Sequence, residues 1–214
     1  MVKSNLKYKK LFEEKKYSEL VFSIESSKEE KDLLAGELNL LGATRLLVAK
    51  NEKNILLSLN NFEAAYLKEK TTQIGLGSLT NYINLIVDLF KVSKIEVDFE
   101  KAILYYNEAK SFWKYNKNLM VAIKRLYWRL NEVDKIHLIL SEMIKNQDYS
   151  SDTICSYIFS QHYRDNWSQK EFLDYSNYLQ EKLPNYKLEN FADLKFSINK
   201  KIKLGFLSGD IRSN

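Results

Sequence analysis

The residues of this chain that could do chemistry gather at its carboxyl end, from Lys201 to Asn214. The segment KIKLGFLSGDIRSN starts with an apolar run and passes at once into Ser208, Gly209 and Asp210. That order is typical of a buried strand entering a tight polar loop, and many nucleotide-binding sheets begin in this way. A single strand leaves its backbone groups and both faces without neighbours. We therefore expect the chain to end as a second, α/β domain begins.

Other reactive side chains are few. His137 and His162 both lie in segments with helical periodicity, where a histidine is usually part of the packing. Cys155 is the single cysteine, which excludes an internal disulfide and fits a reducing compartment. Because Ile154 and Ile158 place it in an apolar helical stretch, we expect a buried structural thiol. None of these residues is assigned a catalytic or metal-binding role.

The composition predicts helices. Only six residues of 214 are glycine and one is proline, and this scarcity of turn residues disfavours an all-β protein.

The formal net charge is +5, but the lysines form pairs instead of the basic stripe of a nucleic-acid-binding protein, so we expect no nucleic-acid partner. The densest apolar segment, residues 82–90, is interrupted by Asn84 and Asp88 and is shorter than the ~20 residues of a membrane span. We expect a cytoplasmic protein without a membrane partner.

One apolar pattern recurs in four segments of the chain. In each, residues at positions 0, +3, +7 and +10 share one face of a helix. Another amphipathic helix precedes each segment, around residues 6–12, 33–48, 79–90 and 119–130. The chain is therefore predicted to consist of helix pairs that cross closely at small residues. The four sets are Tyr17, Leu20, Ile24 and Ser27; Ile55, Ser58, Phe62 and Ala65; Phe99, Ala102, Tyr106 and Ala109; and Val133, Ile136, Leu140 and Met143.

These pairs resemble the tetratricopeptide repeat, a helix-turn-helix unit of 34 residues. Ile136 follows Ala102 by 34 residues, whereas the earlier intervals are longer and indicate insertions. The first-helix signature of the repeat is degraded, although Leu41 and Gly42 keep its Leu-Gly pair and Tyr127 its final aromatic. We expect an all-α fold, an α-solenoid of degenerate tetratricopeptide-type repeats. A generic antiparallel helical bundle is the alternative.

Stacked pairs of this kind form a groove lined by the first helix of each pair. Three of the residues expected to face it are cationic, so the groove would prefer acidic targets and bind them with salt-sensitive affinity. The candidate groove residues are Asn84, Lys91, Arg125, Trp128 and Arg129.

A different segment follows the repeats. Ser168 and, three residues later, Glu171 form a capping box ahead of Phe172, and Pro184 ends the helix that begins there. We divide the chain into repeats at 1–146, a capping helical pair at 147–184, a linker at 185–200, and the strand and loop at 201–214.

The order of these elements resembles the SPINDLY-type O-linked N-acetylglucosamine transferases of glycosyltransferase family 41. In that family, repeats lead into a helix of the form L-F-x-x-x-Y and then S-x-E-E-x-F, which residues 158–163 and 168–172 match here. The catalytic half opens with R-I-G-Y-V-S-x-D-F-R-x-H, where this chain has Ile211 in place of the usual Phe. The Gly, Ser, Asp and Arg of that motif correspond to Gly205, Ser208, Asp210 and Arg212.

The resemblance implies transfer of N-acetylglucosamine from UDP-N-acetylglucosamine to Ser or Thr hydroxyls of protein or peptide substrates. The active-site His of the family would come directly after Asn214, so we expect this chain to hold no catalytic residue and no cofactor, and to be inactive. The asparagine ladder of the family is represented only by Asn84, with Leu40 and Ala122 at equivalent positions. Two alternatives stay open: a non-enzymatic scaffold for protein–protein contacts, and a repeat arm joined to a different transferase.

Overall fold

The computed structural model describes residues 2–27, 29–92, 96–161, 163 and 168–182. This part of the chain is all-helical, as the sequence predicts. The strand-loop residues Gly205, Ser208, Asp210 and Arg212 and the linker lie outside it. The elements are α1 (Val2–Glu13), α2 (Tyr17–Glu25), the short η1 (Glu30–Asp32), α3 (Ala35–Leu47), α4 (Glu52–Lys68), α5 (Gln73–Val92), α6 (Phe99–Phe112), α7 (Lys117–Arg129), α8 (Val133–Lys145), α9 (Ser151–Gln161) and α10 (Gln169–Gln180).

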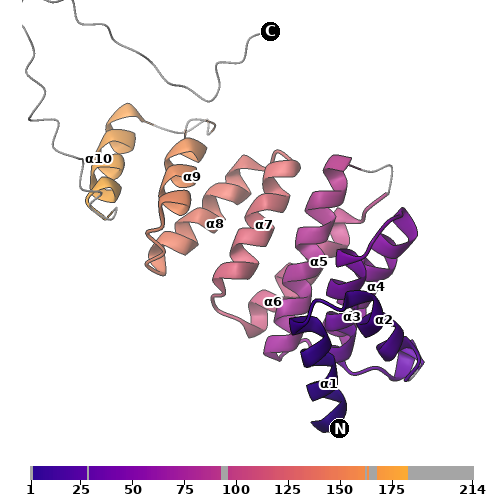
Figure 1. The fold of residues 1–214 in the computed structure, drawn as a ribbon. Coiled ribbons are helices and arrows are strands. Elements are labelled where there is room, and N and C mark those ends of the chain that lie inside the picture. The colour runs from indigo at the N-terminus through magenta and orange to yellow at the C-terminus, as the bar shows by residue number, and fades with distance from the viewer. Residues whose placement is uncertain (1, 28, 93–95, 162, 164–167, 183–214) are drawn as a thin grey trace, which may run out of the picture.

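The helices stack in chain order, from α1 at one end of the molecule to α10 at the other (Figure 1). The first helices of successive pairs, α3, α5 and α7, contact one another in turn. The second helices are linked as well, since the Tyr66 hydroxyl of α4 donates to Glu108 of α6 at 3.2 Å and Lys110 of α6 pairs with Glu142 of α8 at 3.2 Å. The chain thus forms a row of first helices beside a row of second helices.

The repeated apolar pattern is the buried stripe of the second helices. In α6, Ala102, Tyr106 and Ala109 are at most 2% exposed, and the matching positions of α4 and α8 are equally buried. Ser27 departs from the pattern because α2 ends at Glu25; its hydroxyl instead accepts a hydrogen bond from the Tyr8 hydroxyl at 3.0 Å. We expect close crossing at the small residues Ala102 and Ser58. At Ser58 this is confirmed, since a Cβ added to Gly42 of α3 would lie 3.1 Å from the Ser58 carbonyl oxygen and 2.9 Å from the Phe62 ring.

Three turns reverse the chain without glycine. Lys15, Asn131 and Gln147 adopt left-handed backbone conformations, with φ of 57°, 57° and 63°. In each turn, the next backbone N–H donates to a carbonyl five residues earlier, as in Glu132 to Tyr127 and Asp148 to Met143, both at 3.0 Å. This is the Schellman arrangement, which satisfies the last carbonyls of a helix. Because a turn of this type follows each of α1, α7 and α8, each helix is joined to the next by a short connection.

Two apolar cores hold the helices together. The smaller one comes mainly from α1 to α3 and includes Tyr8, Leu20 and Leu38, whereas the larger one runs from α4 to α10. Helix α4 contributes to both, through Ala65 to the smaller core and Phe62 to the larger.

A buried arginine joins the elements around the smaller core. Arg45 of α3 is 8% exposed, and its Nη1 donates to Asn61 Oδ1 of α4 at 2.6 Å. The same guanidinium pairs with Glu25 of α2 at 2.9 Å and with Glu30 of η1 at 3.0 Å. These bonds offset the cost of burying the charge.

Helix α9 corrects one expectation. Cys155 is exposed, because the buried face of α9 consists of Thr153, Ile154, Tyr157 and Ser160, and residue 155 points away from it. The predicted helix start after Ser168 is confirmed, since α10 begins at Gln169.

Two glycines of α5 form a matched pair for testing how closely α5 packs on the end of α4. A Cβ at Gly75 would lie 1.9 Å from the Glu69 carbonyl oxygen, whereas a Cβ at Gly77 would meet nothing within 4 Å. We expect Gly75→Ala to lower the free energy of unfolding by about 1–3 kcal/mol through overpacking. Gly77→Ala should raise it by about 0.5–1 kcal/mol, because alanine favours a helix. Urea denaturation followed by circular dichroism measures both, and shifts of the same sign would contradict this packing.

Asp148 makes the attachment of α9 dependent on pH. Its carboxylate accepts hydrogen bonds from Lys117 Nζ at 2.8 Å and Thr153 Oγ1 at 3.0 Å. Burial works to raise the pKa of Asp148, but the hydrogen bonds from Lys117, Ser150 and Thr153 outweigh it and hold that pKa below its usual value. A carboxyl with a lowered folded pKa stabilises the fold above its unfolded pKa of about 3.9, and this contribution disappears as the pH falls through the folded pKa.

We therefore expect Asp148→Asn to lower the free energy of unfolding by about 1–3 kcal/mol at neutral pH. The difference between variant and parent should shrink as the pH falls below about 4. Denaturation curves of both proteins across this pH range measure the effect, and a difference that stays constant with pH would show that Asp148 is not the titrating group.

Candidate polypeptide-binding face

Two of the candidate groove residues are joined by a direct hydrogen bond between neighbouring first helices. Arg125 of α7 donates from Nη1 to Asn84 Oδ1 of α5 at 2.6 Å, and from Nη2 to Asp88 Oδ1 at 2.7 Å. Within the described part of the chain, no hydrogen bond uses the Asn84 amide nitrogen. Arg125 therefore holds the Asn84 amide through the amide oxygen, and the two N–H donors of Asn84 are left for a ligand.

Similar polar contacts link the other neighbouring first helices. Asn81 of α5 donates to Asn39 of α3 at 3.1 Å. Lys124 of α7, which is 5% exposed, pairs with Asp152 of α9 at 2.7 Å. The row of first helices therefore continues from α3 to α9 with a polar bond at each step.

An aromatic cluster follows the polar contacts toward α9. The half-buried ring of Trp128 lies 6.0 Å from Phe159, and Phe159 lies 5.0 Å from Tyr163. Phe159 and Tyr163 are 51% and 57% exposed, which is high for large apolar rings. We call the surface formed by these polar and aromatic residues the first-helix face; its members are Asn39, Asn81, Asn84, Asp88, Arg125, Trp128, Phe159 and Tyr163.

The remaining candidates differ in position. Arg129 is half-buried at the end of α7 and has no ion pair among the described residues. Lys91 belongs to α5, but its side chain lies outside the described part. Of the positions equivalent to Asn84, Leu40 is half-buried and Ala122 fully buried.

Sequence reasoning missed Asp88 and Phe159 as members of this face. In the sequence, Asp88 only interrupts an apolar segment, yet in the structure it neutralises Arg125. An acidic ligand of Arg125 would thus have to compete with Asp88, which weakens the expectation of a simply basic groove. The available signal was spacing, because Asp88 follows Asn84 by one helical turn and so shares its face.

The described residues give little support for a catalytic histidine, a metal site or a membrane span. His137 is 8% exposed, its Nδ1 lies 3.2 Å from Ser160 Oγ, and its ring lies 4.6 Å from that of Tyr157, so it is a packed structural histidine, as predicted. His162 lies outside the described residues. Within them, no cluster of His, Cys, Asp or Glu is placed to bind a metal. Nor does any described helix combine the length and the apolar character of a membrane span.

Comparisons with protein-family models, with curated proteins and with solved structures give no match to this chain. The resemblance to glycosyltransferase family 41 therefore stays a prediction from the sequence motifs.

The Arg125–Asp88 pair can be tested for a purely structural role. Both side chains are well exposed, at 40% and 61%, and exposed ion pairs contribute about 0–1 kcal/mol. We expect Arg125→Ala and Asp88→Asn each to change the free energy of unfolding by less than about 1 kcal/mol. Chemical denaturation of the single and double variants measures this. A larger loss would mean that the pair holds α5 against α7 instead of presenting groups to a ligand.

Proposed function

We propose that this chain is a polypeptide-binding module built from degenerate tetratricopeptide-type repeats. The observation that carries the proposal is the first-helix face, where Arg125 of α7 holds the Asn84 amide of α5 and Trp128, on the same helix as Arg125, packs against the exposed Phe159 of α9. The buried stripes on the second helices support the repeat assignment, because positions +3 and +7 of the pattern are buried in all four helices, and position +10 is buried in α4, α6 and α8.

The face suits an extended polypeptide. A side-chain amide can bond to a peptide backbone of any sequence, because each peptide group offers one donor and one acceptor. Trp128, Phe159 and Tyr163 add apolar area at low entropic cost, as aromatic residues do in interfaces. Together these groups would bind backbone and side chains of one ligand along the row of first helices.

We further propose that the module recognises the protein substrates of an O-linked N-acetylglucosamine transferase, with UDP-N-acetylglucosamine as the donor of the complete enzyme. This rests on the order of repeats, the helix that follows Ser168, and the motif with Gly205, Ser208, Asp210 and Arg212. The free thiol of the single cysteine, Cys155, supports a reducing compartment such as the cytoplasm.

A non-enzymatic scaffold is the alternative function, since the same face would serve it. Sequencing the gene beyond the codon for Asn214 separates the two. The enzyme requires a histidine codon within one or two positions, followed by a long region of alternating strands and helices. A stop codon at that point would favour the scaffold.

Binding to the first-helix face is testable with an array of short extended peptides. For the peptides bound best by the parent protein, we expect Asn84→Ala and Trp128→Ala to weaken affinity about 5- to 30-fold, as loss of a central interface residue does. Fluorescence anisotropy measures the affinities.

Leu138→Ala provides the matched control. Leu138 of α8 is 66% exposed on the row of second helices, so its truncation should leave both folding and peptide affinity unchanged. Equal affinities for parent, Asn84→Ala and Trp128→Ala, or no selection among the peptides, would overturn the proposal.

A further inference from the structure

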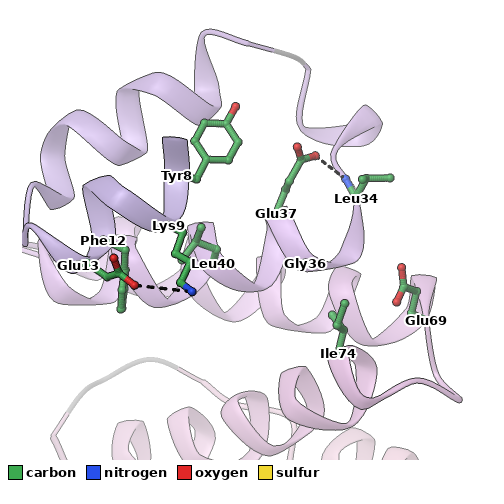
Figure 2. A pocket seen from close by; sticks show the side chains of 10 residues that line it. All are labelled: Tyr8, Lys9, Phe12, Glu13, Leu34, Gly36, Glu37, Leu40, Glu69 and Ile74. Carbon is green, nitrogen blue, oxygen red and sulfur yellow. Dashed lines mark hydrogen bonds and ion pairs between the residues drawn. The ribbon is translucent and has the colours of Figure 1, made fainter. Parts of the chain in front are cut away.

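A groove lies at the amino-terminal end of the row of first helices. It has a volume of about 600 Å³ and lies between α1, α3 and the beginning of α5 (Figure 2). Figure 2 shows side chains of α1 on one side of it and Glu69 and Ile74 on the other. We call it the N-terminal groove; its lining residues are Tyr8, Lys9, Phe12, Glu13, Leu34, Gly36, Glu37, Leu40, Glu69 and Ile74.

Apolar side chains form most of the walls. Tyr8 is buried, Phe12 and Leu40 pack against the smaller core, and Leu34 and Ile74 are 39% and 42% exposed. A volume of this size lies within the range of ligand sites in proteins, which is about 300–1,000 Å³. The groove can therefore bury several apolar side chains of a ligand.

The charge of the groove differs from that of the whole chain. Its lining includes the carboxyl groups of Glu13, Glu37 and Glu69 but a single ammonium, from Lys9. Lys9 already lies 3.8 Å from Glu13. The excess of carboxylates favours a cation in the groove. The chain as a whole, by contrast, carries a net charge of +5.

The carboxylates are held in place by local hydrogen bonds. Glu37 accepts from the backbone N–H of Leu34 at 2.9 Å, and Glu69 accepts from the Thr72 hydroxyl at 2.9 Å. An acidic or uncharged apolar ligand would take the half-buried Glu69 carboxylate further out of water without adding a charged partner, which is costly. A lysine or arginine of the ligand would pair with Glu69, and this complementarity decides which ligand fits.

We propose that the N-terminal groove binds a basic amphipathic segment of a partner polypeptide. Apolar side chains of the segment contact Phe12, Leu40 and Ile74, while its lysines or arginines pair with Glu69 and Glu13. The inference rests on the proposed function, because the groove continues the row of first helices that carries the first-helix face. It adds to the proposed function that the end of the ligand in this groove carries both basic and apolar side chains.

Two labelled peptides of equal length test the preference. One alternates leucine with lysine, and the other has glutamate in place of each lysine. In fluorescence anisotropy, the lysine peptide should bind at least about ten times more tightly, and its affinity should fall as the salt concentration rises. Equal binding of the two peptides, or no binding of the lysine peptide, would refute the proposal.

Variants locate the binding. Ile74→Ser and Glu69→Lys should each weaken the lysine peptide at least about ten-fold. Two controls change the same chemistry elsewhere: Leu138→Ser on α8 and Glu96→Lys before α6, both at exposed positions. Circular dichroism verifies that all four variants fold. Groove variants that bind like the controls would show that the peptide does not occupy the groove.

The same measurements separate this inference from the proposed function. If Trp128→Ala weakens the peptides selected on the array while the groove variants leave the lysine peptide unaffected, the groove proposal fails and the first-helix face stands. If Trp128→Ala has no effect on the array peptides, the proposed function fails, whatever the groove binds.

Discussion

The structure depends on the packing of each second helix against its neighbours through one narrow stripe. Ala102, Tyr106 and Ala109 occupy that stripe in α6, and Ile136, Leu140 and Met143 occupy it in α8. A small residue on the facing first helix allows close approach, as Gly42 of α3 does at Phe62 of α4. Because each stripe is buried against neighbouring helices, the helices stack in sequence order, and the first helices come to lie side by side with one surface exposed.

That surface changes character along its length. At α1 and α3 it is an apolar groove with acidic residues. Between α3 and α7 it consists of hydrogen-bonded amides and the Arg125–Asp88 pair, and toward α9 it is aromatic. A ligand lying along the row would meet three different environments in order. Such a sequence of environments would fix both the direction and the register of a bound chain, which one uniform groove would not do.

The helices were predictable because their apolar spacing follows the helical period, as at Ile136 and Leu140. The early start of α5 at Gln73 was not, since Gly75 and Gly77 weaken the helical signal there. Partners distant in sequence, such as Asn39 and Asn81, depend on how helices stack, which no local pattern specifies. The N-terminal groove was missed for the same reason, as its walls come from three separate helices.

The two cores give ligand binding a thermodynamic meaning. The N-terminal groove takes Tyr8, Phe12 and Leu40 from helices of the smaller core and Ile74 from α5, whose buried residues belong to the larger one. A ligand in the groove would therefore contact helices that contribute to each of the two cores. Since binding to the folded state alone stabilises it by mass action, occupancy would suppress local opening of α1 to α3. Recognition and the cooperativity of folding would then be linked at this end of the molecule.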